Sequence, residues 1–487
     1  MDNTSSIVSK INQITKNKPI FYVTNDPERA IGLESILDNY HIVCIDHNDS
    51  VDILEKKGVK IFCLEKKLGK KNAIFRNSFK LLTHPEVQKY MDQFGKERFI
   101  QLFKPSHQID LYASQNKLET INPLVELNYK FEHKFPQLEF LKKIGVKFPN
   151  SEILDVKSLD YSTLVNKYGN GFLIQFNRGH TGTGTRKIVK ESDLADIKSS
   201  LPSTKVKVCK FIVGKTITFD AVATKKGTYV AGLSEQITGQ RHLTQNVFST
   251  VGNNFKTDYF INEAIINKVF EMAQLVGNAM YKEGFRGLFG LDLIVSTDDV
   301  YLIEINARQP ASTSFVNKLL VKNNQTPISL FHLAEYLNVD TDIDPKEYSL
   351  SNLKSINAGQ VILRNTNVKD ITIHESVTNG IYRLQSDNSS YDWGKEGPTK
   401  KANVIYLDED RDKPLVFINE ACNVEHMEGA GILLTTVAEG RKVTPGSDVC
   451  RIQTLQSIVD EQGNLHPWII EMILKLKDIY RINQNAN

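Results

Sequence analysis

Residues 287–313 constrain the fold of this chain most strongly, because they predict a β-hairpin with acidic side chains on both of its strands. The segment is GLFGLDLIVSTDDVYLIEINARQPAST. Apolar residues alternate along its first part, turn-forming residues follow, and a second strand-like run comes after them. Folding the chain about Asp298 brings Asp292 level with Glu304, since each lies six residues from that point. The hairpin therefore predicts two neighbouring carboxylates.

The same hairpin predicts a site for a hard cation. Glu304 and Asn306 are two residues apart on a strand, so their side chains leave the same face of the sheet. Mg²⁺ takes oxygen ligands such as carboxylates and nucleotide phosphates. A surface hairpin with solvated charges is the alternative, but Glu304 follows the apolar run 301–303, and a carboxylate among buried residues needs a partner. We expect Asp292, Glu304 and Asn306 to hold Mg²⁺ or Mn²⁺, with Arg308 just beyond them.

Length and composition exclude several classes of protein. A chain of 487 residues exceeds one ordinary core and suggests about three domains. A net charge of +3 gives no general basis for binding nucleic acid. No apolar run approaches the ~20 residues that span a bilayer. The five cysteines contain no CxxC pair, which suits a reducing compartment. We therefore expect a cytoplasmic protein without nucleic-acid or membrane partners; a homo-oligomer is compatible with the sequence.

The amino-terminal region has the alternating pattern of a parallel α/β unit. Short apolar strands are predicted at 19–24, 41–46 and 60–65, and a helix at 28–39 between the first two. The turn after the first strand lacks the GxGxxG sequence of a dinucleotide site. The pattern thus predicts a parallel sheet without assigning a cofactor to it.

The rest of the chain is predicted to mix helices with strand-rich regions. Helical sequence continues to about residue 145, and strand-like runs follow between 171 and 232. Residues 262–282 have the spacing of a long amphipathic helix. A second strand-rich region extends from 360 to 437, and a helix is predicted at 466–476. The fold class is therefore α/β (α+β).

Residues 178–185, RGHTGTGT, form a glycine-rich loop between two predicted strands. Glycines let backbone N–H groups approach phosphate oxygens, although an ordinary hairpin loop is the alternative. The spacing is not that of a dinucleotide fingerprint. Residues 214–216, GKT, resemble the end of a P-loop, but Cys209 stands where its first glycine is required.

A third segment, KVKVCKFIVGKT at 205–216, predicts a strand followed by a glycine turn. In this order and at these distances, the three segments resemble the ATP-grasp superfamily over residues 19–310. The resemblance implies that Asp292, Glu304 and Asn306 bind the metal. It also implies a nucleotide-binding lysine at a helix start, matched by Lys134 in FEHKFPQLEFLKKIGVKFP.

The resemblance further assigns nucleotide contacts and catalytic charges. Lys134 and Arg308 would counter the charge of the transition state. The remaining nucleotide-binding positions lie in the lid and in the linker that contacts adenine: Gln175, Gly179, Thr181, Gly182, Thr183, Gly184, Thr185, Lys210, Phe211 and Ile212. This chain departs from the family at Gln175, where lysine is usual, and at Cys209, where an acid is usual.

The implied domain order is that of biotin carboxylase. Residues 1–115 would form a Rossmann-like pre-ATP-grasp domain and residues 116–350 the ATP-grasp domain, with its lid at about 150–212. Residues 351–487 would form a β-rich carboxy-terminal domain.

The implied activity is an ADP-forming ligase that uses ATP and Mg²⁺. It would activate a small-molecule carboxylate as an acyl phosphate and join it to an amine, with an amino acid or small peptide as substrate. A biotin-carboxylase-like activity is one alternative, disfavoured because Ser312 stands where that enzyme has a glutamate. A non-catalytic nucleotide sensor is another, favoured only by Gln175. Arg241 and His242 could contact substrate or lie in a surface loop, whereas Cys422 and His426 are expected at packing and surface positions.

Overall fold

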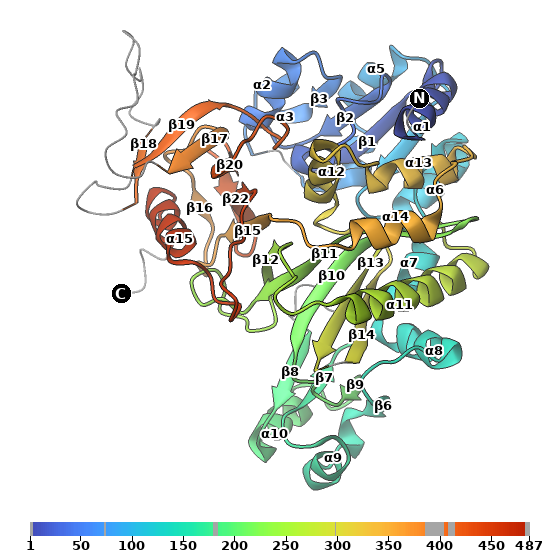
Figure 1. The fold of residues 1–487 in the computed structure, drawn as a ribbon, viewed down its shortest axis with the longest axis vertical. Coiled ribbons are helices and arrows are strands. Elements are labelled where there is room, and N and C mark those ends of the chain that lie inside the picture. The colour runs from blue at the N-terminus through green and yellow to red at the C-terminus, as the bar shows by residue number, and fades with distance from the viewer. Residues whose placement is uncertain are drawn as a thin grey trace.

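The protein has three regions around a long antiparallel sheet, and the computed structural model describes residues 3–72, 75–178, 184–297, 299–384, 404–407 and 414–482. Figure 1 shows the amino-terminal α/β region at the top, a small lid at the bottom and the carboxy-terminal strands at the left. Among these described residues, no helix is long and apolar enough to cross a membrane.

The amino-terminal region is a parallel five-stranded sheet in the order β3-β2-β1-β4-β5. Its central strands are buried along their whole length, as expected when helices cover both faces of a parallel sheet. The predicted parallel unit is thus confirmed. Its elements are α1 (Asn3–Thr15), β1 (Ile20–Thr24), η1 (Pro27–Arg29), β2 (Tyr40–Cys44), α2 (Asp49–Lys56), β3 (Ile61–Cys63), α3 (Leu64–Leu68), α4 (Ser78–Leu82), α5 (Pro85–Asp92), β4 (Phe99–Leu102), α6 (His107–Asn116) and β5 (Glu119–Thr120).

The helix predicted at 28–39 is wrong. The chain there makes only the short 3-10 turn η1 and then a series of turns and bends. Gly32 has φ +130°, which an α-helix does not allow, and a Cβ atom there would lie 2.8 Å from Cβ of Asn317. Close packing against α12 (Thr313–Lys322) therefore replaces the helix that the local sequence favours.

The lid is a four-stranded antiparallel sheet, in the order β6-β9-β7-β8, with helices packed on it. One face buries Phe172, Ile174, Val206 and Val208 in the core of the lid. Alternate residues therefore point to the other face, toward the body of the protein. The elements are β6 (Ser151–Asp155), η2 (Val156–Ser158), α9 (Tyr161–Tyr168), β7 (Phe172–Gln175), β8 (Thr185–Ile188), α10 (Glu191–Ser200) and β9 (Lys205–Cys209).

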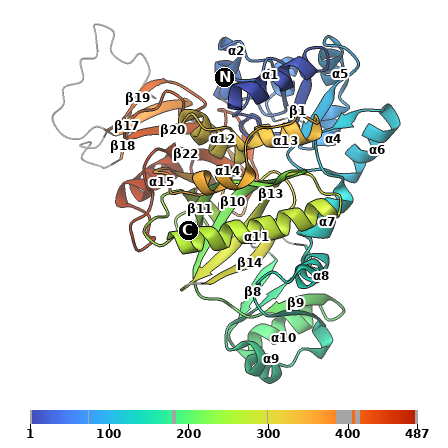
Figure 2. The same cartoon turned by 45° about the vertical axis from the view of Figure 1, so that its right-hand side comes forward.

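The body carries the predicted hairpin and the predicted long helix. Asn262 accepts a hydrogen bond from the backbone N–H of Ile265 at 3.0 Å and so caps α11, whose apolar face packs on the sheet. Figure 2 shows α11 lying along the sheet above the lid. The elements are α7 (Val125–Glu132), α8 (Lys134–Ile144), β10 (Lys215–Thr224), β11 (Gly227–Thr238), β12 (Thr250–Asn254), α11 (Glu263–Lys282), β13 (Gly287–Ser296), β14 (Asp299–Asn306), α13 (Ile328–Tyr336) and α14 (Pro345–Asn352).

The carboxy-terminal strands extend the sheet of the body. The eleven-stranded order is β14-β13-β10-β11-β12-β15-β22-β20-β17-β19-β18, and β12 pairs with β15 through Gly252 and Val361. The expected boundaries at 115/116 and 350/351 fall within α6 and α14. The elements are β15 (Gly359–Arg364), β16 (Ile371–Thr372), β17 (Gly380–Leu384), β18 (Val404–Tyr406), β19 (Pro414–Glu420), β20 (Gly431–Thr436), β21 (Lys442–Val443), β22 (Asp448–Thr454) and α15 (Pro467–Ile479).

Candidate functional site

The predicted hairpin is β13 and β14, and Asp292 pairs directly with Glu304. The route to this pairing differs from the expectation, in which the hairpin folds evenly about Asp298. Ser296 pairs with Asp299 across a two-residue turn, and a β-bulge then leaves Ile303 as the extra residue. The bulge restores the alignment that the shorter turn would otherwise shift by one residue.

Asp292 is a carboxylate held by amide donors. Its Oδ1 accepts a hydrogen bond from Nε2 of Gln236 at 3.0 Å, and its Oδ2 accepts one from Nδ2 of Asn306 at 3.2 Å. Burial raises the pKa of Asp292 to about 6, and the charge of Glu304 adds to the effect. Gln236 belongs to β11, so only the strand order could have revealed this contact from the sequence.

Glu304 pairs with the lysine at the helix start. Nζ of Lys134 lies 2.6 Å from Oε1 of Glu304, and Lys134 is the first residue of α8. Asn177, which follows β7, caps this helix from the lid: its backbone carbonyl accepts from the N–H of Lys134 at 3.2 Å, and its Oδ1 accepts from the N–H of Phe135 at 3.1 Å. Asn177 could not be found from local sequence patterns, because it caps a helix about forty residues away.

Arg308 lies beside the hairpin in a second charged network. Its NH2 group donates to Oδ1 of Asn306 at 3.4 Å, and its Nε lies 3.4 Å from Oε1 of Glu132. Nζ of Lys104 lies 2.9 Å from the same oxygen. Burial raises the pKa of Glu132, but Arg308 and Lys104 outweigh burial and lower it overall, so the carboxylate stays ionised.

The hairpin residues suit a magnesium ion. Within the part of the chain that the structure describes, no cluster of three His, Cys, Asp or Glu side chains could hold a metal, so a site here needs the amide as its third ligand. Asp292, Glu304 and Asn306 supply hard oxygen atoms from adjacent strands. Burial and then the charge of Glu304 raise the pKa of Asp292, and a bound cation would favour its ionised form.

The structure describes some of the lid positions that are predicted to bind nucleotide. Gln175 donates from Nε2 to Oγ1 of Thr185 at 3.3 Å, and the carbonyl of Gly184 accepts from the N–H of Phe176 at 3.0 Å. Gly179, Thr181, Gly182 and Thr183 lie outside the described residues.

The linker positions Lys210, Phe211 and Ile212 directly follow β9. The backbone N–H of Lys210 donates to the carbonyl of Asn150 at 2.9 Å, and the ammonium of Lys187 lies 3.8 Å from the centre of the Phe211 ring. The adenine contact through this linker stays a prediction.

A lysine missed by the sequence interpretation faces the same region. Lys207 of β9 pairs with Gln175 of β7, so the two side chains share one face of the lid. Lys207 is 4% exposed. Burial lowers the pKa of Lys207, Lys134 lowers it further, and Cys209 and Glu304 oppose the shift, which places the ammonium near the Lys134–Glu304 pair. Only the pairing of β7 with β9 reveals this position.

The other candidate residues lie away from the hairpin chemistry. Ser312 is buried and donates to Oδ1 of Asp220 at 2.7 Å. His242 accepts at its backbone carbonyl from Nζ of Lys477, in a loop beside α15. Cys422 is buried, and burial raises the pKa of its thiol to about 12.

Of the remaining two, Arg241 is exposed in the same loop as His242, and His426 is an exposed surface residue. Neither pair forms a catalytic arrangement, and the packing and surface positions expected for Cys422 and His426 are confirmed.

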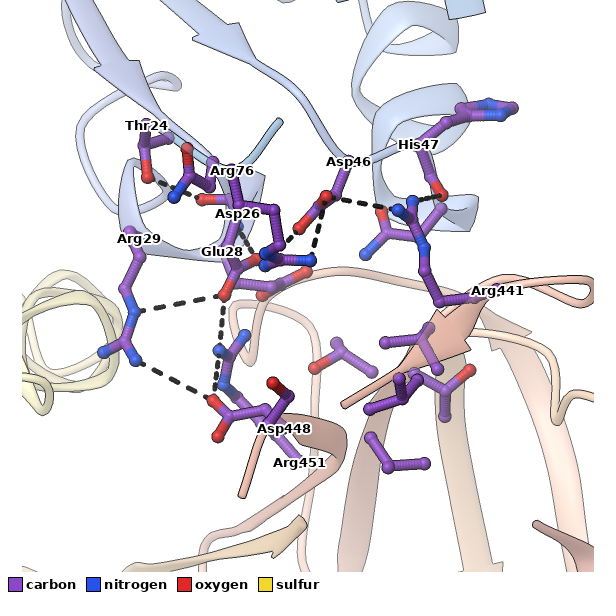
Figure 3. A pocket seen from close by; sticks show the side chains of 18 of the residues that line it. Thr24, Asp26, Glu28, Arg29, Asp46, His47, Arg76, Arg441, Asp448 and Arg451 are labelled. Atoms are coloured by element: carbon purple, nitrogen blue, oxygen red, sulfur yellow. Dashed lines mark hydrogen bonds and ion pairs between the residues drawn. The ribbon is translucent and has the colours of Figure 1, made fainter. Parts of the chain in front are cut away.

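A cavity of about 450 Å³ opens between the amino-terminal sheet and the carboxy-terminal strands. Figure 3 shows two groups of charged side chains on its wall, one around Asp26 and one around Asp46. Phe103 and Lys104 belong to the same wall. Since Lys104 contacts Glu132, and Glu132 contacts Arg308, the cavity adjoins the hairpin site.

Residues 131–312 match the family model of the ATP-grasp domain. This part of the chain is an ATP-grasp domain. A search of curated proteins returns no match. The matched range of this ATP-grasp chain contains the lid, the hairpin, Lys134 and Arg308.

Solved structures share the whole architecture of the ATP-grasp chain. Biotin carboxylase from Campylobacter jejuni superposes with a TM-score of 0.56 at 12% identity, covering 90% of this chain and 87% of that one. Carboxyaminoimidazole ribonucleotide synthase from Aspergillus clavatus gives 0.53 at 12%, covering 96% and 100%. N5-carboxyaminoimidazole ribonucleotide synthetase from Thermotoga maritima gives 0.51 at 15%, covering 95% and 98%. At these identities the likeness concerns the fold, and the predicted fold class and biotin-carboxylase-like order are confirmed.

Proposed function

We propose that this ATP-grasp chain is an ADP-forming ligase that activates a carboxylate as an acyl phosphate and joins it to an amine. The observation that carries the proposal is the convergence of Lys134, Asp292, Glu304, Asn306 and Arg308 from α8, the hairpin and the loop after it. These groups supply metal ligands and positive charge at one place. Structures with the same fold were solved with ATP and with MgADP, which supports both as ligands here.

The reaction has two displacements. A carboxylate oxygen of the substrate attacks the γ-phosphorus of ATP, and the bond from that phosphorus to the β–γ bridging oxygen breaks, so ADP leaves. The amine then attacks the acyl carbon, the bond to the phosphate oxygen breaks, and the amine loses a proton. Both steps develop charge on phosphate oxygens, so positioning and neutralisation matter more than proton transfer.

Each residue of the site has a role in this scheme. We assign Asp292, Glu304 and Asn306 as ligands of Mg²⁺, which when bound would neutralise the nucleotide phosphates. Nζ of Lys134 lies 2.6 Å from Oε1 of Glu304. When nucleotide binds, Lys134 would give up part of this contact and contact a phosphate oxygen instead. Arg308 would stabilise the transferring phosphoryl group from the other side.

The lid would bind the nucleotide through the face that carries Gln175 and Lys207. The family lysine that usually stands at position 175 would contact phosphate, and glutamine cannot supply that charge. We assign its role to Lys207, one strand away on the same face. This assignment removes the main support for a non-catalytic sensor, because the strand pair retains a cation.

A biotin-carboxylase-like reaction is disfavoured by the surroundings of Ser312. A serine hydroxyl does not ionise near neutral pH, and here it is committed to a hydrogen bond with Asp220. It cannot prepare bicarbonate as the glutamate of that enzyme does. Bicarbonate-dependent ADP formation stimulated by free biotin would contradict this conclusion.

The test is ADP formation by the purified chain with Mg-ATP and a panel of carboxylate and amine substrates. Glu304→Gln keeps the size of the side chain but removes a metal ligand, so turnover should fall at least a hundredfold while thermal stability changes little. Glu283→Gln is the matched control, because Glu283 also pairs with lysines but lies outside the site. Turnover of Glu304→Gln equal to the control would refute the proposed function.

A further inference from the structure

The wall of the cavity is rich in charged side chains, and many of them pair with one another. Six basic and four acidic side chains line it, from both the amino-terminal region and the carboxy-terminal strands: Arg29, Arg76, Lys104, Arg441, Lys442 and Arg451, with Asp26, Glu28, Asp46 and Asp448. The volume of about 450 Å³ is in the range of small-molecule sites. The excess of basic groups favours a ligand that carries an anionic group.

The end of the cavity near the hairpin site is suited to that anionic group. Arg29 lies 3.9 Å from Asp26 and 3.8 Å from Asp448, which is too far for direct hydrogen bonds. Figure 3 shows its guanidinium directed toward these two carboxylates at one side of the cavity. The same guanidinium stacks at 4.8 Å from the ring of Phe103, and the next residue is Lys104. Arg29, whose Nη1 donates to the carbonyl of Ala311 at 3.2 Å, and Lys104 thus place two positive charges beside the path to Arg308.

Three polar atoms on the cavity wall have no hydrogen-bond partner among the described residues: Oδ1 of Asn25, Oδ1 of Asn48 and Oγ1 of Thr435. Asn48 is 9% exposed and Thr435 is 4% exposed. Asn48 directly precedes α2 and makes no side-chain hydrogen bond that caps the helix. Buried polar atoms are normally paired, so these three point to a missing partner. Two of them are carbonyl oxygens, which can only accept and therefore require a ligand with N–H or O–H donors.

A carboxylate of the cavity wall, Asp46, lies close to Asn25 and Asn48 along the chain or through the backbone. The backbone N–H of Asp46 donates to the carbonyl of Asn25 at 2.9 Å, and Asn48 follows two residues later. Asp46 contacts Arg76 at 2.7 Å and Arg441 at 3.3 Å. Burial nevertheless raises the pKa of Asp46 to about 6, so its negative charge is incompletely compensated. A cationic donor would satisfy Asp46 and the unpaired oxygens together.

We propose that this cavity binds the carboxylate substrate of the ligation, and that this substrate is a zwitterion of the amino-acid class, either a free amino acid or a short peptide. Its carboxylate lies at the Arg29–Lys104 end, next to Arg308, and its ammonium lies at the Asp46–Asn48–Thr435 end. The statement that the carboxylate of this ligand reacts rests on the proposed ligase function. The distribution of charges and unpaired acceptors supports the ligand class independently.

The geometry links binding to the reaction. Lys104 belongs to the cavity wall and contacts Glu132, which in turn contacts Arg308. The carboxylate end of the ligand therefore points toward the site where the γ-phosphate would be transferred. An opposite orientation would place the ammonium among Arg29, Lys104 and Arg308 and leave the oxygens of Asn48 and Thr435 without a donor.

The first measurement is calorimetric binding of individual L-amino acids and dipeptides to the full chain, without nucleotide. The second is ADP formation with the same compounds, their carboxamides and their N-acetyl derivatives. A compound that binds should lose at least tenfold in affinity on N-acetylation, and its carboxamide should support no ADP formation. A carboxamide that supports ADP formation as well as the free acid would overturn the orientation.

Thr435→Val tests the cavity with little disturbance of the fold. The variant removes a buried hydroxyl that has no partner, so thermal stability should stay equal or rise. The KM for the amino-acid substrate should rise at least tenfold while the KM for ATP stays unchanged. Thr454→Val is the matched control, because the hydroxyl of Thr454 is also buried but donates to the carbonyl of Gly431 outside the cavity. That control should lose stability without a change in KM.

The outcomes separate this proposal from the proposed function. Binding of an amino acid or dipeptide that Thr435→Val weakens, without any turnover, would support the cavity assignment and contradict the ligase. Turnover of a carboxylate that lacks an amine, unaffected in Thr435→Val, would overturn the cavity assignment and leave the ligase in place. Failure of the whole panel to bind in calorimetry would also overturn it.

Discussion

Exchanging Lys207 and Gln175 tests whether the nucleotide-binding cation has moved to a neighbouring strand. The two residues pair across β9 and β7 and share a face of the lid. Lys207→Gln removes the cation, and Lys207→Gln combined with Gln175→Lys returns it at the position usual for the family. We expect the single variant to lose nucleotide affinity and the exchange variant to recover most of it.

We expect Lys207→Gln to weaken nucleotide binding but not to lower the free energy of unfolding. A hydrogen bond from an ammonium to a phosphate contributes about 1.5–3 kcal/mol, which corresponds to a loss of roughly 10- to 150-fold in affinity. In the free protein, Lys207 is 4% exposed, and burial lowers the pKa of its ammonium. Removing this desolvated charge should therefore leave the free energy of unfolding unchanged or raise it by about 1–3 kcal/mol.

The assay is calorimetric titration of a non-hydrolysable Mg-ATP analogue, with thermal unfolding of the same samples. Lys205→Gln is the control, because Lys205 lies on the same strand but is exposed. An unchanged affinity in Lys207→Gln would refute the proposed role of Lys207. If Lys207→Gln loses nucleotide affinity and thermal stability to the same extent, Lys207 only supports the structure of the lid. Weak nucleotide binding by the exchange variant would show that a lysine at position 175 does not replace one at position 207.

Three further predictions concern residues that hold the site together. Burial raises the pKa of Asp220 to about 6, so the folded protein binds that proton more tightly than the unfolded chain. Stability should fall by roughly 3 kcal/mol as the pH rises from about 4 to about 6, and urea denaturation of Asp220→Asn should lack this loss. Asn177→Ala removes the bond to the N–H of Phe135 and should cost about 1 kcal/mol in urea denaturation and raise the KM for ATP. A Cβ atom at Gly290 would lie 2.8 Å from Pro310, so Gly290→Ala should lower kcat by displacing the loop after Arg308; unchanged kcat would contradict that coupling.

The sequence predicted the parts of the site that depend on local spacing. Glu304 and Asn306 share a face because alternation along a strand is local, and the helix that begins at Lys134 ends at a local stop signal, Gly145. Gln236, Asn177 and Lys207 could not be predicted, since each acts through pairing or capping between segments far apart in the sequence.

The fold followed the same division between local and long-range information. The parallel strands and the helix at 262–282 were predicted to within a few residues. The helix predicted at 28–39 failed because Gly32 packs against α12, almost three hundred residues later. The continuity of the large sheet was also beyond the sequence, because β12 and β15 are joined only by tertiary pairing.

The continuous sheet limits how this chain can be rebuilt by recombination. A chimera joined between α14 and β15 would replace β15, the partner that pairs with Gly252 and Asn254 of β12. A foreign carboxy-terminal segment would have to reproduce that register or leave an open strand edge prone to aggregation. The part of the cavity wall on β20 and β22 and the acidic hairpin lie on opposite sides of this junction within one hydrogen-bonded sheet. A change of substrate specificity in this protein would therefore come from point substitutions in the cavity wall, and not from transplanting the carboxy-terminal strands as a module.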